Sequence, residues 1–406
     1  MKTIQKSSKL NNVTYDVRGP LLDEAARMAA DGKEIIKLNI GNPAPFGYRT
    51  PDAVLRSLAV ALPDTQGYSD SKGLPEACEA IAAYHRGKGI RGVTADDVYT
   101  GNGVSELIQM CMQALLNNGD EVLIPAPDYP LWTASATLSG GVVRHYMCDE
   151  KSDWMPDTAD IRRKVSPRTK AIVIINPNNP TGAVYGRDIL EEIIKIAREN
   201  DLIIFSDEIY DRLCMDGLEH TSIASMAPDV FCVTMNGLSK SHLIAGWRCG
   251  WMCLSGPKEK VSGYIEGLNM LTSMRLCSNV PAQSLIPTAL ACADATRPMY
   301  EPGGRVYEQR ATLCDELSKI DGLSFVKPRA AFYIFPKLDK ERFGITDDER
   351  FALDFLREKR VLIVRGMGFN WPEPDHFRLV YLAETPVLKD AVGRLADFLK
   401  DYHQEP

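Results

Sequence analysis

The sequence has no apolar run long enough to cross a membrane and no cysteine pair with metal-site spacing. A membrane helix needs about 20 consecutive apolar residues, and none of the apolar segments approaches that length. The first residues, MKTIQKSSKLNN, carry charges without an apolar core, which argues against a secretory signal. The ten cysteines are scattered without a CxxC pair, as is typical of free thiols in a reducing compartment. We therefore expect a cytoplasmic protein with no membrane contact and no metal site.

Basic clusters are missing as well. The chain has 47 Lys and Arg residues against 54 Asp and Glu residues, a formal net charge of -7, spread along its length. Because proteins that bind nucleic acids concentrate basic residues, no nucleic-acid partner is expected. The apolar content of 45% and charged content of 25% describe an ordinary globular protein. A chain of 406 residues is long enough for one large domain and one smaller domain.

Between about residues 75 and 255, short apolar segments alternate with helical patterns. The strand-like segments include EVLIPAP, TKAIVIINP, DLIIFSDEIY and VFCVTMNG. This alternation predicts the α/β class, with a mostly parallel sheet covered by helices on both faces. After this region the strands are too few for another large sheet, which favours a smaller α+β domain.

The N-terminal segment LLDEAARMAADGKEIIKLNIG reads as an amphipathic helix followed by a short strand. We expect it to join the smaller domain. The predicted division is an N-terminal arm at 1–14, a first part of the small domain at 15–47, a large domain at 48–295 and a second part of the small domain at 296–406.

Unusual residues follow five successive predicted strands. The segments are TGNGVSE, PAPDYPLW, NPNNPTG, SDEIY and NGLSK. In an open α/β sheet, ligands bind at the carboxyl ends of the strands. Five such ends with glycine, proline, asparagine, acid, tyrosine or lysine therefore indicate a single site.

Two of these segments can hold polar groups of a ligand. GNGVSEL, at residues 101–107, opens a helix with small residues, and free N–H groups at a helix start can bind a phosphate. Tight packing of the helix start would explain it equally well. In NPNNPTG, each residue before a proline is pushed out of the helical region, so a rigid loop can point Asn179 into a pocket. The alternative is a proline-rich turn without function.

Charged residues mark the other strand ends. Asp207 ends an apolar strand, where a carboxylate needs a positive partner unless it caps a helix. Lys240 stands before an apolar, glycine-spaced segment, and a lysine in a dry pocket can form a Schiff base with an aldehyde. Arg248 offers a two-point fork to a phosphate or forms a structural ion pair. Together these groups describe a holder for pyridoxal 5′-phosphate, an electron-sink cofactor.

Three motifs, NPNNPTG, SDEIY and LSK…GWRCGW, resemble the class I aminotransferases in order and spacing, and the resemblance covers nearly the whole chain. It implies fold type I of the pyridoxal-phosphate-dependent transferases, with a mostly parallel seven-stranded sheet between helices and a smaller α+β domain. It also implies Lys240 as the Schiff-base lysine and proton carrier. Asp207 would pair with the ring nitrogen, and Asn179 and Tyr210 would bind the ring's phenolic oxygen.

The same resemblance assigns further residues by their positions in the motifs. Those that would hold the cofactor's phosphate or stack on its ring are Gly103, Val104, Ser105, Ser239, Arg248 and Tyr129. Arg378, in DHFRLVYL, would bind the α-carboxylate of the amino acid, and Gly41 would lie beside that carboxylate. Tyr68 resembles a tyrosine that reaches the phosphate of the neighbouring subunit, which implies a homodimer with shared sites.

The segments YDVRGP and SMRLCSNVPAQ resemble alanine aminotransferases more than aspartate or aromatic ones. The implied reaction joins alanine and 2-oxoglutarate to pyruvate and glutamate, in two half-reactions at one site. Arg18 and Arg275 lie in these segments and could meet the distal carboxylate of glutamate. Ala330 replaces a glycine common in the family, so a small change in the pocket wall is expected.

Other activities stay open at this stage. Aspartate, aromatic or branched-chain specificity would keep the same reaction with another substrate. A pyridoxal-phosphate C–S lyase or decarboxylase would use the same lysine and acid, and a regulatory module could retain the fold without activity.

Overall fold

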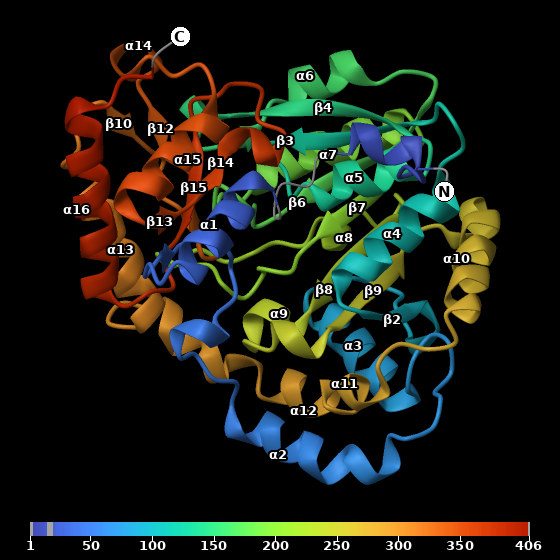
Figure 1. Cartoon of the computed structure of the whole chain (residues 1–406). Coiled ribbons are helices and arrows are strands. Elements are labelled where there is room, and N and C mark those ends of the chain that lie inside the picture. Colours follow the sequence, from blue (N-terminus) through green and yellow to red (C-terminus); the bar gives the residue numbers. More distant parts are fainter. Residues whose placement is uncertain (1–2, 14–18, 405–406) are drawn as a thin grey trace.

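The computed structural model describes residues 3–13 and 19–404, and one mixed β-sheet lies at its centre (Figure 1). The strands stand in the order β2 (Val98–Asn102), β9 (Cys249–Ser255), β8 (Cys232–Gly237), β7 (Ile203–Asp207), β6 (Thr169–Ile175), β3 (Glu121–Ala126), β4 (Val142–Asp149) and β5 (Met155–Pro156). The five strands from β8 to β4 are parallel, whereas β9 is antiparallel to both of its neighbours. The expected seven strands are thus joined by an eighth, β5, whose two residues are too few to give a sequence pattern.

Apolar residues on β6 alternate between the two faces of this sheet. Ile172 and Ile174 pack into one core cluster, and Val173 packs into the other. The first cluster takes in α3 (Pro75–Gly87) and α7 (Arg187–Glu199), and the second takes in α4 (Val104–Leu115), α5 (Leu131–Leu138) and α10 (Ser262–Met274). The sheet is therefore covered on both faces, as the apolar strand sequences predict.

A third core cluster joins segments from the two ends of the chain. Residues between 21 and 48 share it with residues between 300 and 399. Strand β1 (Ile36–Lys37) pairs in parallel with β13 (Val361–Leu362), and α1 (Pro20–Ala30) packs against α15 (Asp348–Lys359) (Figure 1). The C-terminal helix α16 (Thr385–Asp401) packs against α15 and α13 (Arg305–Leu317). The N-terminal segment thus packs with the C-terminal part, while the division into domains with boundaries at residues 14, 47 and 295 stays a prediction.

The other elements connect or extend these units. A small antiparallel sheet has the order β11 (Tyr333–Ile334), β15 (Phe377–Val380) and β14 (Val364–Arg365), and β10 (Leu323–Ser324) pairs with β12 (Lys337–Leu338). The remaining α-helices are α2 (Asp52–Ala61), α6 (Thr158–Lys164), α8 (Ile223–Met226), α9 (Leu238–Ser241), α11 (Val280–Ser284), α12 (Ile286–Ala291) and α14 (Lys340–Phe343). Within residues 3–13 and 19–404, no helix is long and apolar enough to span a membrane.

The strand directions bring the unusual segments to one edge of the large sheet. β2 runs the same way as β8, because β9 is antiparallel to both. The carboxyl ends of β2, β3, β6, β7 and β8 therefore lie at the same edge, and each is followed by one of the five polar segments.

Candidate active site

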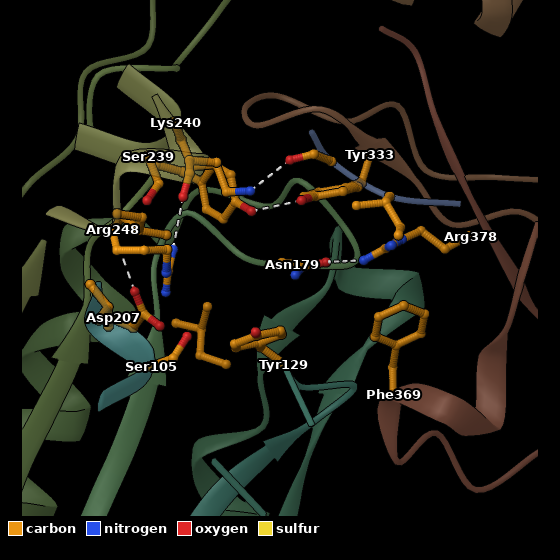
Figure 2. Close-up of a pocket in the computed structure, with 17 residues that line it drawn as sticks. Ser105, Tyr129, Asn179, Asp207, Ser239, Lys240, Arg248, Tyr333, Phe369 and Arg378 are labelled. Carbon is orange, nitrogen blue, oxygen red and sulfur yellow. Dashed lines mark hydrogen bonds between the residues drawn. The ribbon is translucent and has the colours of Figure 1, made fainter. Parts of the chain in front are cut away.

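A pocket of about 190 Å³ lies at this edge, between the large sheet and the third core cluster. Its walls hold side chains from both (Figure 2). The lining residues are Ile40, Gly41, Val104, Ser105, Tyr129, Ile175, Asn179, Asp207, Ile209, Tyr210, Ser239, Lys240, Ala245, Arg248, Tyr333, Phe369 and Arg378.

Lys240 lies in α9, which begins directly after β8. Its Nζ donates a hydrogen bond to the backbone oxygen of Gly41 at 2.7 Å, across the pocket. Among the described residues, no carboxylate forms an ion pair with it. The amine is thus held in the pocket by a neutral acceptor that it can leave without separating two charges.

Asp207 ends β7 and is only 3% exposed. Its carboxylate accepts from Trp132 Nε1 at 3.3 Å and from the Ile209 backbone N–H at 3.3 Å, and both donors are neutral. Burial raises the pKa of Asp207 to about 6. A cationic group in the pocket would stabilise the carboxylate, and the protonated nitrogen of a pyridine ring is such a group.

The start of α4 and Arg248 form a site for an anion. Arg248 donates to the backbone oxygens of Ala245 at 2.9 Å and of Asn102 at 3.2 Å. Gly103, at the helix start, has a φ of 80°, and a Cβ there would lie 2.2 Å from Arg248 Nη2. Glycine therefore lets the guanidinium approach the free N–H groups of the helix start, where a phosphate group is stabilised. Val104, Ser105 and Ser239 line the same end of the pocket.

Arg378 lies on the opposite side of the pocket from Arg248 (Figure 2). Its guanidinium carbon is 4.4 Å from the ring centre of Tyr333 and 4.6 Å from that of Phe369. Nη1 donates to Asn179 Oδ1 at 2.9 Å, Nη2 donates to the Asn39 backbone oxygen, and Nε is buried without a partner among the described residues. Because aromatic rings lie against the guanidinium, a carboxylate must approach along its edge, where a two-point contact is possible.

These features fit pyridoxal phosphate. Among the described pocket residues, the buried carboxylate of Asp207 has no cationic partner and the amine of Lys240 has no anionic partner. Next to Gly103, the start of α4 and Arg248 form an anion site. Tyr210 and Asn179 line the pocket between these groups, and Tyr129 offers an aromatic ring. The donor set therefore matches the ring nitrogen, aldehyde, phenolic oxygen and phosphate of that cofactor.

Two predicted residues lie outside the pocket, and a third falls outside the described residues. Tyr68 is 82% exposed and does not line the pocket. Arg275 donates to Glu106 Oε2 at 2.6 Å and to the backbone oxygens of Thr100 and Ser71, so its guanidinium is held outside the pocket in this chain. Arg18 lies outside the described residues. A role of any of the three toward substrate or cofactor stays a prediction.

Tyr333 and Phe369 are pocket residues that the sequence did not reveal. Both belong to the C-terminal part and lie far along the chain from Lys240, which closes the last of the five strand-end segments. The segment KPRAAFYIFP contained Tyr333, but its apolar pattern is equally typical of a core strand.

The alanine at position 330 leaves the backbone unstrained. Ala330 is fully buried, and the left-handed residue of this segment is its neighbour Ala331, with a φ of 65°. The Tyr381 hydroxyl donates to the backbone oxygens of both alanines, at 3.1 and 3.0 Å. Tyr381 therefore holds this segment in place. Neither Ala330 nor Ala331 lines the pocket, so the expected change of the pocket wall at Ala330 is not found.

Comparison with known proteins finds matches to one enzyme family along nearly the whole chain. Residues 33–395 match the family described as aminotransferase class I and II. Glutamate-pyruvate aminotransferase AlaA of Escherichia coli is 56% identical over 404 residues, covering all of both chains. Alanine aminotransferase of Mycobacterium tuberculosis is 51% identical over 404 residues, covering 99% of this chain and 94% of the relative. The crystal structure of an aminotransferase from Escherichia coli has a TM-score of 0.98 at 56% identity and full coverage of both chains. The predicted fold type I architecture is confirmed.

Proposed function

The chain belongs to the class I and II aminotransferases, and we propose that it moves the amino group of L-alanine to 2-oxoglutarate, giving pyruvate and L-glutamate, and catalyses the reverse reaction. The observation that carries this choice of substrates is full-length similarity, at 56% and 51% identity, to proteins named for glutamate–pyruvate and alanine transamination. The pocket is compatible with the small apolar side chain of alanine, because Phe369 offers apolar surface beside Arg378, with its ring centre 4.6 Å from the guanidinium carbon.

Aminotransferases of this class generally use pyridoxal 5′-phosphate, and we propose that this chain binds it. The cofactor, when bound, supplies an electron sink that stabilises the carbanion formed at the substrate's Cα. Arg248, Ser239 and the start of α4 from Gly103 to Ser105 would hold its phosphate. Asp207 would keep the ring nitrogen protonated, Asn179 and Tyr210 would bind the phenolic oxygen, and Tyr129 would lie against the ring.

Lys240 is the catalytic base in this proposal. Its Nζ would hold the cofactor's aldehyde. As a neutral amine, Nζ would remove the proton from the substrate's Cα and deliver it to the cofactor, not back to Cα. Gly41, whose oxygen accepts from Nζ at 2.7 Å, keeps the amine inside the pocket between the two half-reactions, which share one site.

Arg378 binds the α-carboxylate, so replacing it with lysine is expected to raise KM for alanine more than it lowers kcat. A lysine keeps the charge but loses the planar fork, its stacking on two rings and the hydrogen bond to Asn179. We expect KM to rise about 30-fold, or roughly 2 kcal/mol of lost binding. Steady-state kinetics measures this, with Arg394→Lys on the surface of α16 as the matched control. An unchanged KM would remove Arg378 from the carboxylate site.

We also propose a homodimer. Apolar side chains of α10 and the residues after it are exposed, with Met270 at 60%, Met274 at 75% and Leu276 at 54%. Arg275 binds the Ser71 backbone oxygen at 2.8 Å, which brings this surface beside the segment of the exposed Tyr68. An apolar surface of this kind favours self-association. Sedimentation at assay concentration tests the proposal, and a monomer that is fully active would rule out shared sites.

A cytoplasmic location is part of the proposal. All ten cysteines are free thiols, which is typical of a reducing compartment. Cell fractionation tests it, and recovery with the membrane or secreted fraction would contradict it.

Alanine and aspartate should act differently on the purified enzyme loaded with pyridoxal phosphate. We expect a visible absorption band that alanine bleaches and 2-oxoglutarate restores, with little response to aspartate. Spectrophotometric titration with each compound measures this. Bleaching by aspartate or an aromatic amino acid alone would keep the aminotransferase and replace the substrate, while absence of any band would overturn the proposed cofactor.

A further inference from the structure

Two tyrosine hydroxyls share one hydrogen bond in the wall of the pocket. Tyr210 follows β7, and Tyr333 lies in β11 of the small antiparallel sheet. Their hydroxyl oxygens are 2.8 Å apart, and the side chains are 3% and 2% exposed. Neither hydroxyl has another hydrogen-bond partner among the described residues, so one of the two protons lies in the shared bond and the other is free.

Tyr333 is fixed on two further sides. The guanidinium of Arg378 lies over its ring, 4.4 Å from the ring centre. A Cβ at Gly41 would lie 2.1 Å from the Tyr333 hydroxyl oxygen, so the hydroxyl lies directly against the backbone of Gly41. Only glycine permits this approach, and the same residue accepts the hydrogen bond of Lys240. Tyr333 therefore contacts both Arg378, at the proposed carboxylate site, and Gly41, which accepts the hydrogen bond of the Lys240 amine.

The position of Arg378 decides which hydroxyl donates. A cation over a phenol ring withdraws electron density, which makes that O–H a better donor and a poorer acceptor. Tyr333 has this cation against its ring face, and Tyr210 does not. Donation of the Tyr333 proton into the shared bond would leave the Tyr210 proton to point into the pocket. Burial raises the pKa of Tyr210 well above its usual range, which keeps that proton in place.

We infer that Tyr333 is a positioning residue that donates its hydroxyl proton to Tyr210 and so turns the Tyr210 hydroxyl into a donor to the cofactor's phenolic oxygen. The inference rests on the proposed function and adds a second role for the same side chain. The ring stacks on Arg378 and supports binding of the α-carboxylate, while the hydroxyl acts on the cofactor. The two roles belong to different atoms and can be separated by substitution.

Tyr333→Phe removes the hydroxyl and keeps the ring. We expect the pH midpoint of the visible band of the loaded enzyme to rise by several tenths of a unit to about one unit, because a donor to the phenolic oxygen is no longer oriented. KM for alanine should stay within about twofold. Tyr333→Leu also removes the ring and should raise KM about tenfold, as a lost cation–π contact predicts.

The double variant Tyr210→Phe/Tyr333→Phe tests the direction of the effect. If Tyr333 acts through Tyr210, the double variant has the same midpoint as Tyr210→Phe alone. A shift that adds in full to that of Tyr210→Phe would overturn the inference, and so would an unchanged midpoint in Tyr333→Phe. Affinity of the cofactor-free variants for pyridoxal phosphate gives a second readout, expected to weaken in Tyr333→Phe and to show no further loss in the double variant. If the wild-type enzyme itself shows no visible band after loading, the proposed cofactor is contradicted, and the inference about Tyr333 is not the part that has failed.

Discussion

Lys240→Ala is expected to lower the rate of transamination by about 10⁴-fold or more. A positioned general acid–base group contributes roughly 10²- to 10⁴-fold, and this variant also loses the group proposed to hold the cofactor's aldehyde. No other amine lines the pocket to replace it among the described residues. The measurement is the rate of pyruvate formation from alanine and 2-oxoglutarate, together with the visible spectrum of the loaded protein.

The control is Lys195→Ala, which removes an exposed lysine from the outer surface of α7. It should retain full activity and the wild-type spectrum. Turnover near the wild-type rate in Lys240→Ala would remove this residue from the mechanism. If externally added amines restored part of the lost rate, the missing group would be identified as the base rather than as a structural contact.

Asp207→Asn should lower kcat by about 10²- to 10³-fold while leaving the fold intact. The side chains have the same shape, but asparagine cannot hold a proton on the ring nitrogen by its charge, and lost electrostatic stabilisation of this kind has effects of that size. The measurement is kcat in the alanine half-reaction, with Asp201→Asn, an exposed acid just before β7, as the control. A kcat within about threefold of wild type would contradict the role.

The same variant gives a pH test. In the cofactor-free protein, burial raises the pKa of Asp207 to about 6, so its carboxylate form is lost as the pH falls through that value. Affinity for pyridoxal phosphate should therefore decrease from pH 7 to pH 5 more steeply in the wild type than in Asp207→Asn. Equal slopes in the two proteins would mean that the titrating group lies elsewhere, for example on the phosphate.

Residues at strand ends could be predicted because strand direction alone brings them together. Asp207, Lys240 and Asn179 follow parallel strands, and any parallel arrangement of those strands places them at one edge. Tyr333 and Phe369 could not be placed in this way. They reach the pocket through the packing of the third core cluster against the sheet, and no local spacing encodes the relative position of two separately folded layers.

The directions of long polar side chains could not be predicted from the sequence either. Arg275 lies in a segment that resembles alanine aminotransferases, yet Glu106 and two backbone oxygens hold its guanidinium outside the pocket. The seven expected strands all formed, while β5 escaped prediction because two residues show no alternation. Sequence patterns thus identified elements and motifs, whereas partners of long polar side chains depended on tertiary contacts.

The pairing of β1 with β13 has a consequence for synthesis of the chain. Ile36 pairs with Val361, so the apolar face of α1 has no complete core until nearly the whole polypeptide has been made. At about 5 to 20 residues per second, the ribosome needs roughly 15 to 60 s to produce the intervening chain. The large sheet can form during that interval, because its strands lie between residues 98 and 255. Helix α1 therefore emerges before the large sheet but completes its core after it, and until then Leu21 and Met28 offer an apolar surface to chaperones.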